Sequence, residues 1–286
     1  MTDAMVDWMG AMRPRLHRYA ARMMGSVFDG EDVVQDAMTK AAEALKAGTE
    51  VARGEAWLFR ITHNAALDAL RQRRRQEARD AMAIEIGQSG DEADQRIAVE
   101  TGLGTFLNIA PAQRSCVILI DILGHSLVEA GGVLEMTVPA VKAALHRGRT
   151  RLRSLAASEN PARALPPAER QRLRAYADRF NAHDWDALRA LLAADVKLDL
   201  VNRARLSGAP DVSVYFSQYA RYTDAAEWRL TAGAAEGRPA LLAHHGAALD
   251  VPSYVILLEW RAGQIAGIRD FHFATYVMDG LDWSLI

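Results

Sequence analysis

Basic side chains gather in two short segments of this 286-residue chain. The first segment contains Arg71, Arg73, Arg74, Arg75 and Arg79, and the second contains Lys142, Arg147, Arg149, Arg151 and Arg153. Few acids lie beside them, so each cluster can neutralise the phosphates of a polyanion. The formal net charge of the whole chain is only −2, which argues against a protein that coats nucleic acid without selection. The two clusters therefore predict two separate contacts with a polyanion.

The first cluster ends a segment of helical periodicity, residues 56–80. Leu58, Ile61, Ala65 and Ala69 fall on one side of such a helix and predict a packing face. The other side carries the residues that we assign to DNA contact: Arg60, His63, Asn64, Asp68, Arg71, Arg74 and Arg75. The charges from Arg71 to Arg75 are nearly all positive, and Asn64 can hydrogen-bond a base edge. The alternative is a solvated helix face, which is the usual outcome for a run of charges.

Residues 126–155 have the spacing of a helix-turn-helix. Leu127 to Leu134 is the predicted first helix, Glu135 and Met136 form a tight turn, and Thr137 caps a second helix that begins at Val138. The outward face of the second helix carries the predicted DNA contacts: Thr137, Pro139, Ala140, Lys142, Ala143, His146, Arg147 and Arg149. Small residues followed by basic side chains suit a helix whose start enters a major groove and whose later turns bind phosphates. An ordinary antiparallel helix pair has the same spacing, so the pattern alone leaves both interpretations open.

A third segment, residues 29–45, begins with Asp29, Glu31, Asp32 and Asp36, where carboxylates stabilise the positive end of a helix dipole. Alone, this pattern indicates only good capping. The side chains of Asp32, Gln35, Asp36, Thr39 and Lys40 also suit a protein-docking surface.

Two boundaries divide the chain into three predicted domains. Residues 1–81 form helices at about 14–25, 30–46 and 55–80, residues 82–103 a polar linker, and residues 104–157 a second helical domain. Three prolines mark a second linker, residues 158–168. From 169 to 286 we expect an α+β domain, with helices at about 168–182, 184–193 and 211–222 and strands near 195–201, 226–233, 238–248, 253–260 and 264–274.

In their order along the chain, the three helical segments resemble the extracytoplasmic-function (ECF) group of sigma factors. Residues 15–45 look like the helices that bind the polymerase β′ clamp helices, 56–75 like the helix that meets the minus-10 promoter element, and 109–153 like the minus-35-binding domain. The resemblance implies a cytoplasmic transcription initiation factor that is not an enzyme. Its partners would be promoter DNA and core RNA polymerase, through the β′ clamp helices and the β flap. A ligand-sensing repressor is a weaker interpretation, because it has no use for a second basic helix.

The last domain, residues 169–286, is similar in its order of elements to the SnoaL-like family, a cone of curved antiparallel sheet closed by helices. The resemblance implies a cone that can hold an acid/base site. Its candidate lining is Tyr176, Trp185, Asp270, His272 and Tyr276, with His183 nearby. Asp270 and His272 would share one face of a strand, although a structural polar pair is the commoner outcome. We therefore expect a regulatory domain that packs on the sigma domains or the polymerase, with a small ligand or a regulatory protein as a further partner. A SnoaL-like enzyme or ligand sensor tethered to a DNA-binding module stays open as the alternative.

Other classes of site find little support in the sequence. Cys116 is the only cysteine and lies in the apolar run SCVILI, so we expect an inert core thiol and neither a disulfide nor a multi-cysteine zinc site. His244 and His245 are adjacent on a predicted strand and point to opposite faces, which makes them a poor ligand pair. No apolar run approaches the roughly 20 residues of a membrane span. The sequence thus predicts no metal, no cofactor and no membrane contact.

Overall fold

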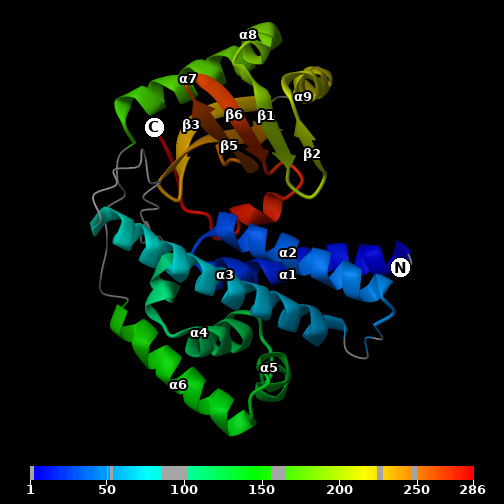
Figure 1. Ribbon diagram of the computed structural model, residues 1–286, viewed down its shortest axis with the longest axis vertical. Coiled ribbons are helices and arrows are strands. Elements are labelled where there is room, and N and C mark those ends of the chain that lie inside the picture. Colours follow the sequence, from blue (N-terminus) through cyan, green and yellow to red (C-terminus); the bar gives the residue numbers. More distant parts are fainter. Residues whose placement is uncertain are drawn as a thin grey trace. The chain divides into compact units, whose positions relative to one another are not determined.

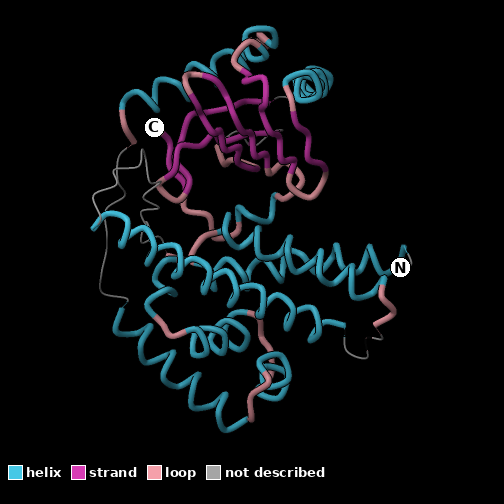
Figure 2. Tube along the Cα trace, viewed as in Figure 1, coloured by secondary structure: helices cyan, strands magenta, loops and turns pink. Residues whose placement is uncertain are grey.

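The computed structural model describes residues 3–49, 51, 54–85, 102–155, 165–223, 228–245 and 250–286. The chain forms two compact units, Met1–Pro161 and Ala162–Ile286, which we describe separately. All the strands of the described residues belong to the second unit, and the first unit is helical (Figure 2). This distribution confirms the predicted fold class. The predicted linkers, 82–103 and 158–168, lie largely outside the described residues.

Three long helices begin the first unit: α1 (Asp3–Met24), α2 (Val27–Lys46) and α3 (Gly54–Glu85) (Figure 1). The three predicted helices are confirmed, although α1 begins well before its predicted start. Leu16, Val34 and Phe59, one from each helix, are fully buried. Burial of each such side chain stabilises the unit by about 1.5–3 kcal/mol.

A second helical group follows: η1 (Gly104–Asn108), α4 (Pro111–Val117), η2 (Ile118–Ile122), α5 (Leu127–Leu134) and α6 (Val138–Leu155). Ser126 and Glu129 form a capping box that fixes the start of α5. The Thr137 hydroxyl accepts a hydrogen bond from the Ala140 amide at 3.4 Å, which confirms the predicted cap of α6. The two helices and their turn therefore form the predicted helix-turn-helix motif.

The turn of this motif requires the glycine that precedes it. A Cβ atom on Gly131 would lie 2.8 Å from the Met136 carbonyl oxygen, closer than real Cβ contacts. The Met136 amide closes the turn by donating to the Gly131 carbonyl at 3.0 Å. Glu135 between them adopts φ 55°, the left-handed conformation that ends many helices. The turn therefore requires glycine at position 131, although glycine destabilises a helix by about 1 kcal/mol relative to alanine.

The second unit is built on a seven-stranded sheet in the order β2-β1-β6-β5-β4-β3-β7. Its strands are β1 (Leu192–Leu200), β2 (Ala204–Ser207), β3 (Trp228–Ala235), β4 (Arg238–His245), β5 (Tyr254–Arg261), β6 (Gln264–Asp270) and β7 (Trp283–Leu285). Only β1 and β6 pair in parallel. Two-residue turns at 236–237 and 262–263 join β3 to β4 and β5 to β6, and both turn residues have positive φ in each case.

Helices α7 (Pro167–Asn181), α8 (Trp185–Arg189) and α9 (Ala209–Thr223), with η3 (Thr275–Met278), complete the second unit. In Figure 1, α7 lies across the sheet and α9 lies beside β1 and β2. The Asn181 side chain ties α7 to β3, because its amide donates to the Leu230 carbonyl and accepts from the Leu230 amide, both at 2.9 Å. The helix packing is thus fixed by a polar clamp as well as by apolar burial.

The structure corrects two predicted boundaries in the second unit and adds two strands. The helix predicted at 184–193 ends at Arg189, because β1 already begins at Leu192. The strand predicted at 264–274 ends at Asp270. The sequence also failed to predict β2 and β7, which are too short, at four and three residues, to show an alternating pattern.

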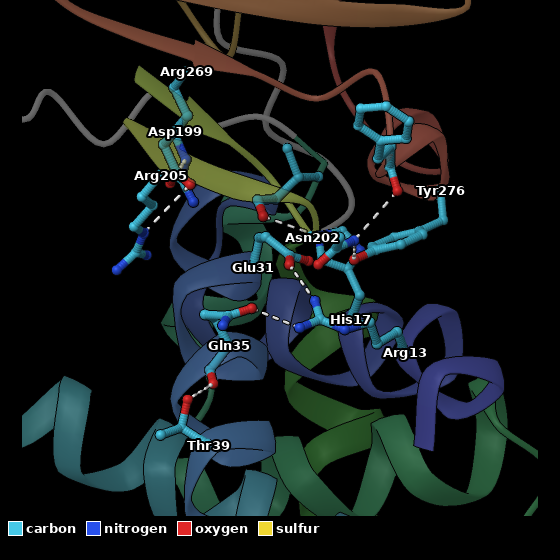
Figure 3. Close-up of polar contacts among 12 residues, drawn as sticks. Arg13, His17, Glu31, Gln35, Thr39, Asp199, Asn202, Arg205, Arg269 and Tyr276 are labelled. Atoms are coloured by element: carbon cyan, nitrogen blue, oxygen red, sulfur yellow. Dashed lines mark hydrogen bonds and ion pairs between the residues drawn. The ribbon is translucent and has the colours of Figure 1, made fainter. Parts of the chain in front are cut away.

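An ion-pair ladder crosses one edge of this sheet. Asp199 on β1 lies 3.4 Å from Arg205 on β2 and 3.7 Å from Arg269 on β6, as Figure 3 shows. Cross-strand pairs of opposite charge stabilise a sheet by about 0.2–1 kcal/mol each.

None of the described helices is both long enough and apolar enough to cross a lipid bilayer.

Candidate nucleic-acid interface

The outward face of α6 is exposed while its inward face is buried. Val141 and Leu145 pack inward, at 0% and 6% exposure. Of the predicted contacts, Thr137, Pro139, Lys142, Ala143, His146, Arg147 and Arg149 are exposed, and Ala140 is half-buried. Neither Lys142 nor Arg147 forms an ion pair with another described residue, whereas Arg149 donates two hydrogen bonds to Asp121, at 2.9 and 2.5 Å. The α6 face therefore presents positive charge that is available to a phosphate backbone.

The α3 residues predicted to contact the minus-10 element are Arg60, His63, Asn64, Asp68, Arg71, Arg74 and Arg75, and we call them the minus-10 stripe. Its second half is exposed: Asn64, Arg71, Arg74 and Arg75 all face solvent. Arg71 pairs with Asp68 one turn earlier, at 2.6 Å, but both side chains are exposed. An exposed pair of this kind contributes about 0.2–1 kcal/mol, so a DNA phosphate can replace Asp68 at little cost.

The first half of the minus-10 stripe has partners inside the unit. An Arg60 Nη1 atom lies 3.1 Å from a Glu135 carboxylate oxygen, in the turn of the helix-turn-helix. The His63 Nδ1 atom lies 2.7 Å from the Tyr19 hydroxyl and 3.4 Å from the Ser115 hydroxyl. Burial lowers the pKa of His63, and the nearby Glu135 carboxylate partly opposes that shift. The fold thus turns Arg60 and His63 toward the second helical group.

A buried arginine joins the two helical groups at the end of α1. Arg114 on α4 is 3% exposed, and its guanidinium donates to the Met23 carbonyl oxygen, which the end of α1 leaves without a helical partner. It also donates to the carbonyl oxygens of Leu107, at 3.1 Å, and Ile109, at 2.9 Å. Burial lowers the pKa of Arg114 to about 10. Since three carbonyl oxygens share one guanidinium, the contact between the groups is specific as well as apolar.

The start of α3 makes a further contact with the second group. Glu55 lies 2.6 Å from Arg15 on α1 and 3.9 Å from the Nε2 atom of His125, in the loop before α5. The His125 ring packs edge-on against Phe59, with 5.0 Å between ring centroids. Burial lowers the pKa of His125. One buried apolar cluster runs through both helical groups of the unit.

The predicted polymerase-contact residues lie mostly on the exposed face of α2. Asp32, Asp36, Thr39 and Lys40 are exposed, and Asp36 pairs with Lys40 at 2.7 Å. Gln35 is half-buried and accepts a hydrogen bond from Arg13 on α1, which also pairs with the buried Glu31 at 2.9 Å (Figure 3). Gln35 therefore helps to hold α1 against α2, and less of its side chain is available to the polymerase.

An open groove of about 640 Å³ runs between α2 and α3. Asp32, Asp36 and Lys40 line its α2 side, and Asp68 and Arg75 belong to its α3 side. The groove thus brings predicted polymerase-contact residues and part of the minus-10 stripe together on one surface. Its lining carries both signs of charge, which suits a partner with a mixed polar surface better than a polyanion.

In the second unit, the predicted pocket residue Asp270 is fully buried and accepts three hydrogen bonds. The hydroxyls of Tyr215 and Tyr219 donate to its Oδ2 atom, at 2.8 and 2.7 Å, and the His272 amide donates to Oδ1 at 2.8 Å. The Tyr254 hydroxyl lies 2.8 Å from that of Tyr219. Burial raises the pKa of Asp270, and the three hydrogen bonds oppose the shift. This carboxyl group is therefore held inside a tyrosine cluster.

The other predicted pocket residues, Tyr176, Trp185 and Tyr276, each have different surroundings. The Tyr176 hydroxyl is buried without a hydrogen-bond partner among the described residues, and burial together with the Asp270 charge raises its pKa. Trp185 packs edge-on against Phe180, with 5.2 Å between ring centroids, and stacks on His183. The Tyr276 hydroxyl instead accepts a hydrogen bond from Asn202 at 2.8 Å (Figure 3).

The prediction that Asp270 and His272 share a face of one strand was wrong. Because β6 ends at Asp270, His272 lies in the following turn, where its backbone amide donates to the carboxylate. The His272 ring packs against Tyr254 and Trp228, with centroids 5.1 and 5.3 Å apart. Among the described residues, no group of three or more metal-binding side chains is close enough to hold an ion.

Comparison with known proteins agrees with the two helical groups of the first unit and with the separate second unit. The family models for Sigma-70 region 2, Sigma-70 region 4 and the SnoaL-like domain match residues 8–76, 108–152 and 173–268. The ECF RNA polymerase sigma factor SigE of Mycolicibacterium smegmatis is 31% identical over 55% of this chain, and the chain spans 64% of that relative's length. The ECF RNA polymerase sigma factor SigM of Mycobacterium tuberculosis is 31% identical over 49% of this chain and 71% of the relative.

The chain belongs to the ECF family of RNA polymerase sigma factors. The crystal structure of the M. tuberculosis ECF sigma factor SigJ is also similar, with 18% identity over 93% of this chain and 95% of that chain and a TM-score of 0.36. In this sigma factor, the region 2 match spans most of α1, all of α2 and α3 as far as Gln76. The region 4 match ends on α6, so it contains the helix-turn-helix.

Several residues of this sigma factor were not found from its sequence. Tyr215 and Tyr219 are four residues apart on α9, a spacing that puts both hydroxyls on one helix face and was a usable signal. The sequence indicated only that Glu135 belongs to a turn and that Arg114 lies within the segment 109–153. Their partners lie 75 and 91 residues away, in another helical group, and no local pattern indicates such contacts.

Proposed function

We propose that this sigma factor directs core RNA polymerase to promoters through three surfaces. The outward face of α6 contacts the minus-35 element, the minus-10 stripe of α3 contacts the minus-10 element, and α2 contacts the polymerase. One observation carries the proposal: seven of the eight predicted minus-35 residues are exposed on the side of α6 opposite its buried face. A helix that only packed against a neighbour would have no reason to gather small residues there together with Lys142 and Arg147, which form no ion pair with another described residue.

The groove between α2 and α3 supports the polymerase contact. We place the β′ clamp helices there, because its mixed charges suit a polar helical surface. The β flap would then meet the second helical group. Both contacts require a location with the polymerase, in the cytoplasm.

Co-purification tests the polymerase contact. The double variant Asp32→Lys with Asp36→Lys reverses two exposed charges on α2 and should weaken association with core polymerase. Because exposed substitutions usually change stability by no more than about 0.5 kcal/mol, the unit should stay folded. The matched control, Asp186→Lys with Asp250→Lys, reverses two exposed acids of the second unit and should co-purify normally. Normal co-purification of the α2 variant would reject the assignment.

We propose that the second unit regulates by contact and is not an enzyme. The observation that supports this proposal is the burial of Asp270, since its side chain is fully buried and both of its oxygens accept hydrogen bonds from protein groups. A general base needs an oxygen that can reach a substrate proton. The unpartnered Tyr176 hydroxyl favours the second candidate, a small ligand bound beside the tyrosine cluster.

A cleavable chain tests regulation by contact. A protease site inserted within residues 156–164 allows the same folded molecules to be assayed before and after the two units are disconnected. Run-off transcription with core polymerase should change on cleavage, because a tethered domain acts at a high effective concentration that cleavage removes. Unchanged transcription, together with turnover of a small molecule that Asp270→Asn abolishes, would favour the enzyme.

A further inference from the structure

An open groove runs along one face of α7, the first helix of the second unit. Its volume is about 490 Å³, and the described residues that line it share that helix face: Pro167, Arg170, Gln171, Arg174, Ala175 and Asp178. We call three of them, spaced four positions apart, the α7 row: Arg170, Arg174 and Asp178. Arg174 and Asp178 are exposed, and Arg170 is half-buried. The α7 row therefore presents two positive charges followed by one negative charge.

The two arginines of the α7 row have no acidic partner in the part of the chain that the structure describes. Four other arginines of the same unit each pair with an aspartate: Arg189, Arg205, Arg261 and Arg269. Two neighbouring positive charges without a counterion favour an acidic partner. A phosphate backbone fits less well, because Asp178 continues the row and repels the next phosphate. The α7 row therefore suits a protein surface with two acids and one base.

The exposed face of α2 carries that pattern. Three of its predicted polymerase-contact residues, again spaced four positions apart, form the α2 row: Asp32, Asp36 and Lys40. All three are exposed and line the groove between α2 and α3. Placed alongside each other in the same direction, the two rows match each charge with its opposite. In the opposite direction, each end of one row would meet a like charge, so the charges select the parallel arrangement.

Helix geometry allows the two rows to meet along their length. Side chains four positions apart form the ridges through which helices most often pack, with the helix axes about 50° apart. The ridges of both helices lie parallel in this arrangement, so three pairs of opposite charge can form. Asp36 and Lys40 pair with each other at 2.7 Å, but both side chains are exposed. Exchange of that exposed pair for partners on α7 therefore costs little.

We propose that the α7 row of one molecule binds the α2 row of a second copy of this chain. Such a contact joins different surfaces of the two molecules, so each molecule has one surface of each kind to offer. The contact also covers acids that we assign to polymerase binding. Self-association then competes with the polymerase for α2 and holds excess sigma factor inactive. This last step rests on the proposed function, whereas the association itself does not.

Sedimentation velocity of the full-length chain tests the association. The wild type should sediment faster as its concentration rises, with a dissociation constant on the order of 10–100 µM, because exposed charge pairs bind weakly. Raising the salt concentration from about 0.1 to 1 M shortens the Debye length from about 10 to 3 Å and should restore the monomer. A wild type that stays monomeric at low salt overturns the proposal, whether the α7 row then binds DNA or another protein.

Charge reversals locate the two surfaces. Arg170→Glu with Arg174→Glu should weaken self-association more than about tenfold, because two attractive pairs become repulsive, and so should Asp32→Lys with Asp36→Lys. The matched control, Arg172→Glu with Arg221→Glu, reverses two exposed arginines outside the groove lining and should associate like the wild type. Equal weakening in the control would assign the effect to net charge and overturn the proposal.

A mixture of the two charge-reversed variants tests whether the contact joins two molecules. One variant keeps a native α2 row and the other keeps a native α7 row, so an equimolar mixture should form the complex that neither variant forms alone. Formation of the complex also shows that both variants are folded. A mixture that stays monomeric would overturn the contact between copies.

Polymerase binding separates the self-association from the proposed function. Above the dissociation constant of self-association, Arg170→Glu with Arg174→Glu should bind core polymerase about two- to fivefold more tightly than the wild type, since less of it is self-associated. If that variant is monomeric but binds polymerase as the wild type does, the association stands and the polymerase role of the α2 row is rejected. If the wild type is monomeric and the α2 variant still loses polymerase binding, the proposed function stands and the self-association is rejected.

Discussion

The two basic helices of the first unit, α6 and α3, differ in what the side chains predicted to contact DNA touch in the folded chain. On α6, Lys142 and Arg147 project into solvent without an ion-pair partner among the described residues. On α3, Arg60 is paired with Glu135, and His63 is held between Tyr19 and Ser115. The two faces were predicted by the same reasoning from charge and periodicity. The comparison teaches that one pattern of charge and periodicity can predict both a face whose bases are exposed and a face that is partly engaged inside the fold.

The largest effect is expected from removing the free charges of α6. Lys142→Ala with Arg147→Ala should weaken promoter binding on the order of tenfold and reduce the salt slope by about two, because each lost phosphate contact reduces it by about one. Binding should be measured by fluorescence anisotropy over a range of salt concentrations. Arg172→Ala with Arg174→Ala, two exposed arginines of α7, is the matched control. Equal losses in both variants would remove the special role of α6.

The turn that positions α6 can be broken by one methyl group. Gly131→Ala places a Cβ against the Met136 carbonyl oxygen and should lower the free energy of unfolding by about 1–3 kcal/mol. The neighbouring Gly132→Ala meets no atom within 4 Å and should raise it by up to about 1 kcal/mol. Urea unfolding checks both. If both substitutions stabilise the protein, the close approach at Gly131 is not needed for the turn.

Low pH should destabilise the packing of the first half of α3 against the second helical group. Burial lowers the pKa of His63, which faces Tyr19, Ser115 and the Glu135 charge, and of His125, which faces Glu55, Arg15 and Glu129. A histidine whose folded pKa is depressed contributes stability that is present above the unfolded pKa, about 6.5, and is lost as the pH falls below it. The free energy of unfolding of the first unit should therefore decrease from neutral pH downward.

Two substitutions isolate the source of this pH dependence. His63→Gln should flatten the profile of unfolding free energy against pH. His146→Gln, at an exposed histidine of α6, should leave the profile unchanged. A profile that keeps its slope after His63→Gln would assign the effect to His125 or to other groups.

The smallest effect is expected at Arg149. This arginine belongs to the predicted minus-35 face but is already paired with Asp121. Arg149→Gln should change both stability and promoter affinity by less than about 1 kcal/mol, because the pair is largely exposed. Lys142→Ala should reduce the affinity more. A larger loss of promoter affinity for Arg149→Gln than for Lys142→Ala in a direct binding titration would mean that internal ion pairing does not predict which basic side chains of α6 bind DNA.

The sequence was most informative where structure is local. The cap at Thr137 and the helical spacing on either side of the turn at Glu135 and Met136 were enough to predict the helix-turn-helix, since each signal depends on neighbours within one or two turns. The pair of Arg60 and Glu135, separated by 75 positions, depends on how helices pack and left no local signal. The placement of His272 failed for a related reason, because its prediction relied on a strand that ends two residues earlier.

The order of the sheet in the second unit affects how this protein behaves at high concentration. Its two edge strands, β2 and β7, have only four and three residues, and β2 carries Arg205, whose charge is exposed. Long, flat, uncharged edges invite strands from other molecules to add to a sheet, whereas short or charged edges discourage it. The second unit is therefore protected against edge-to-edge aggregation, and its long, hydrophobic strands lie in the interior of the sheet.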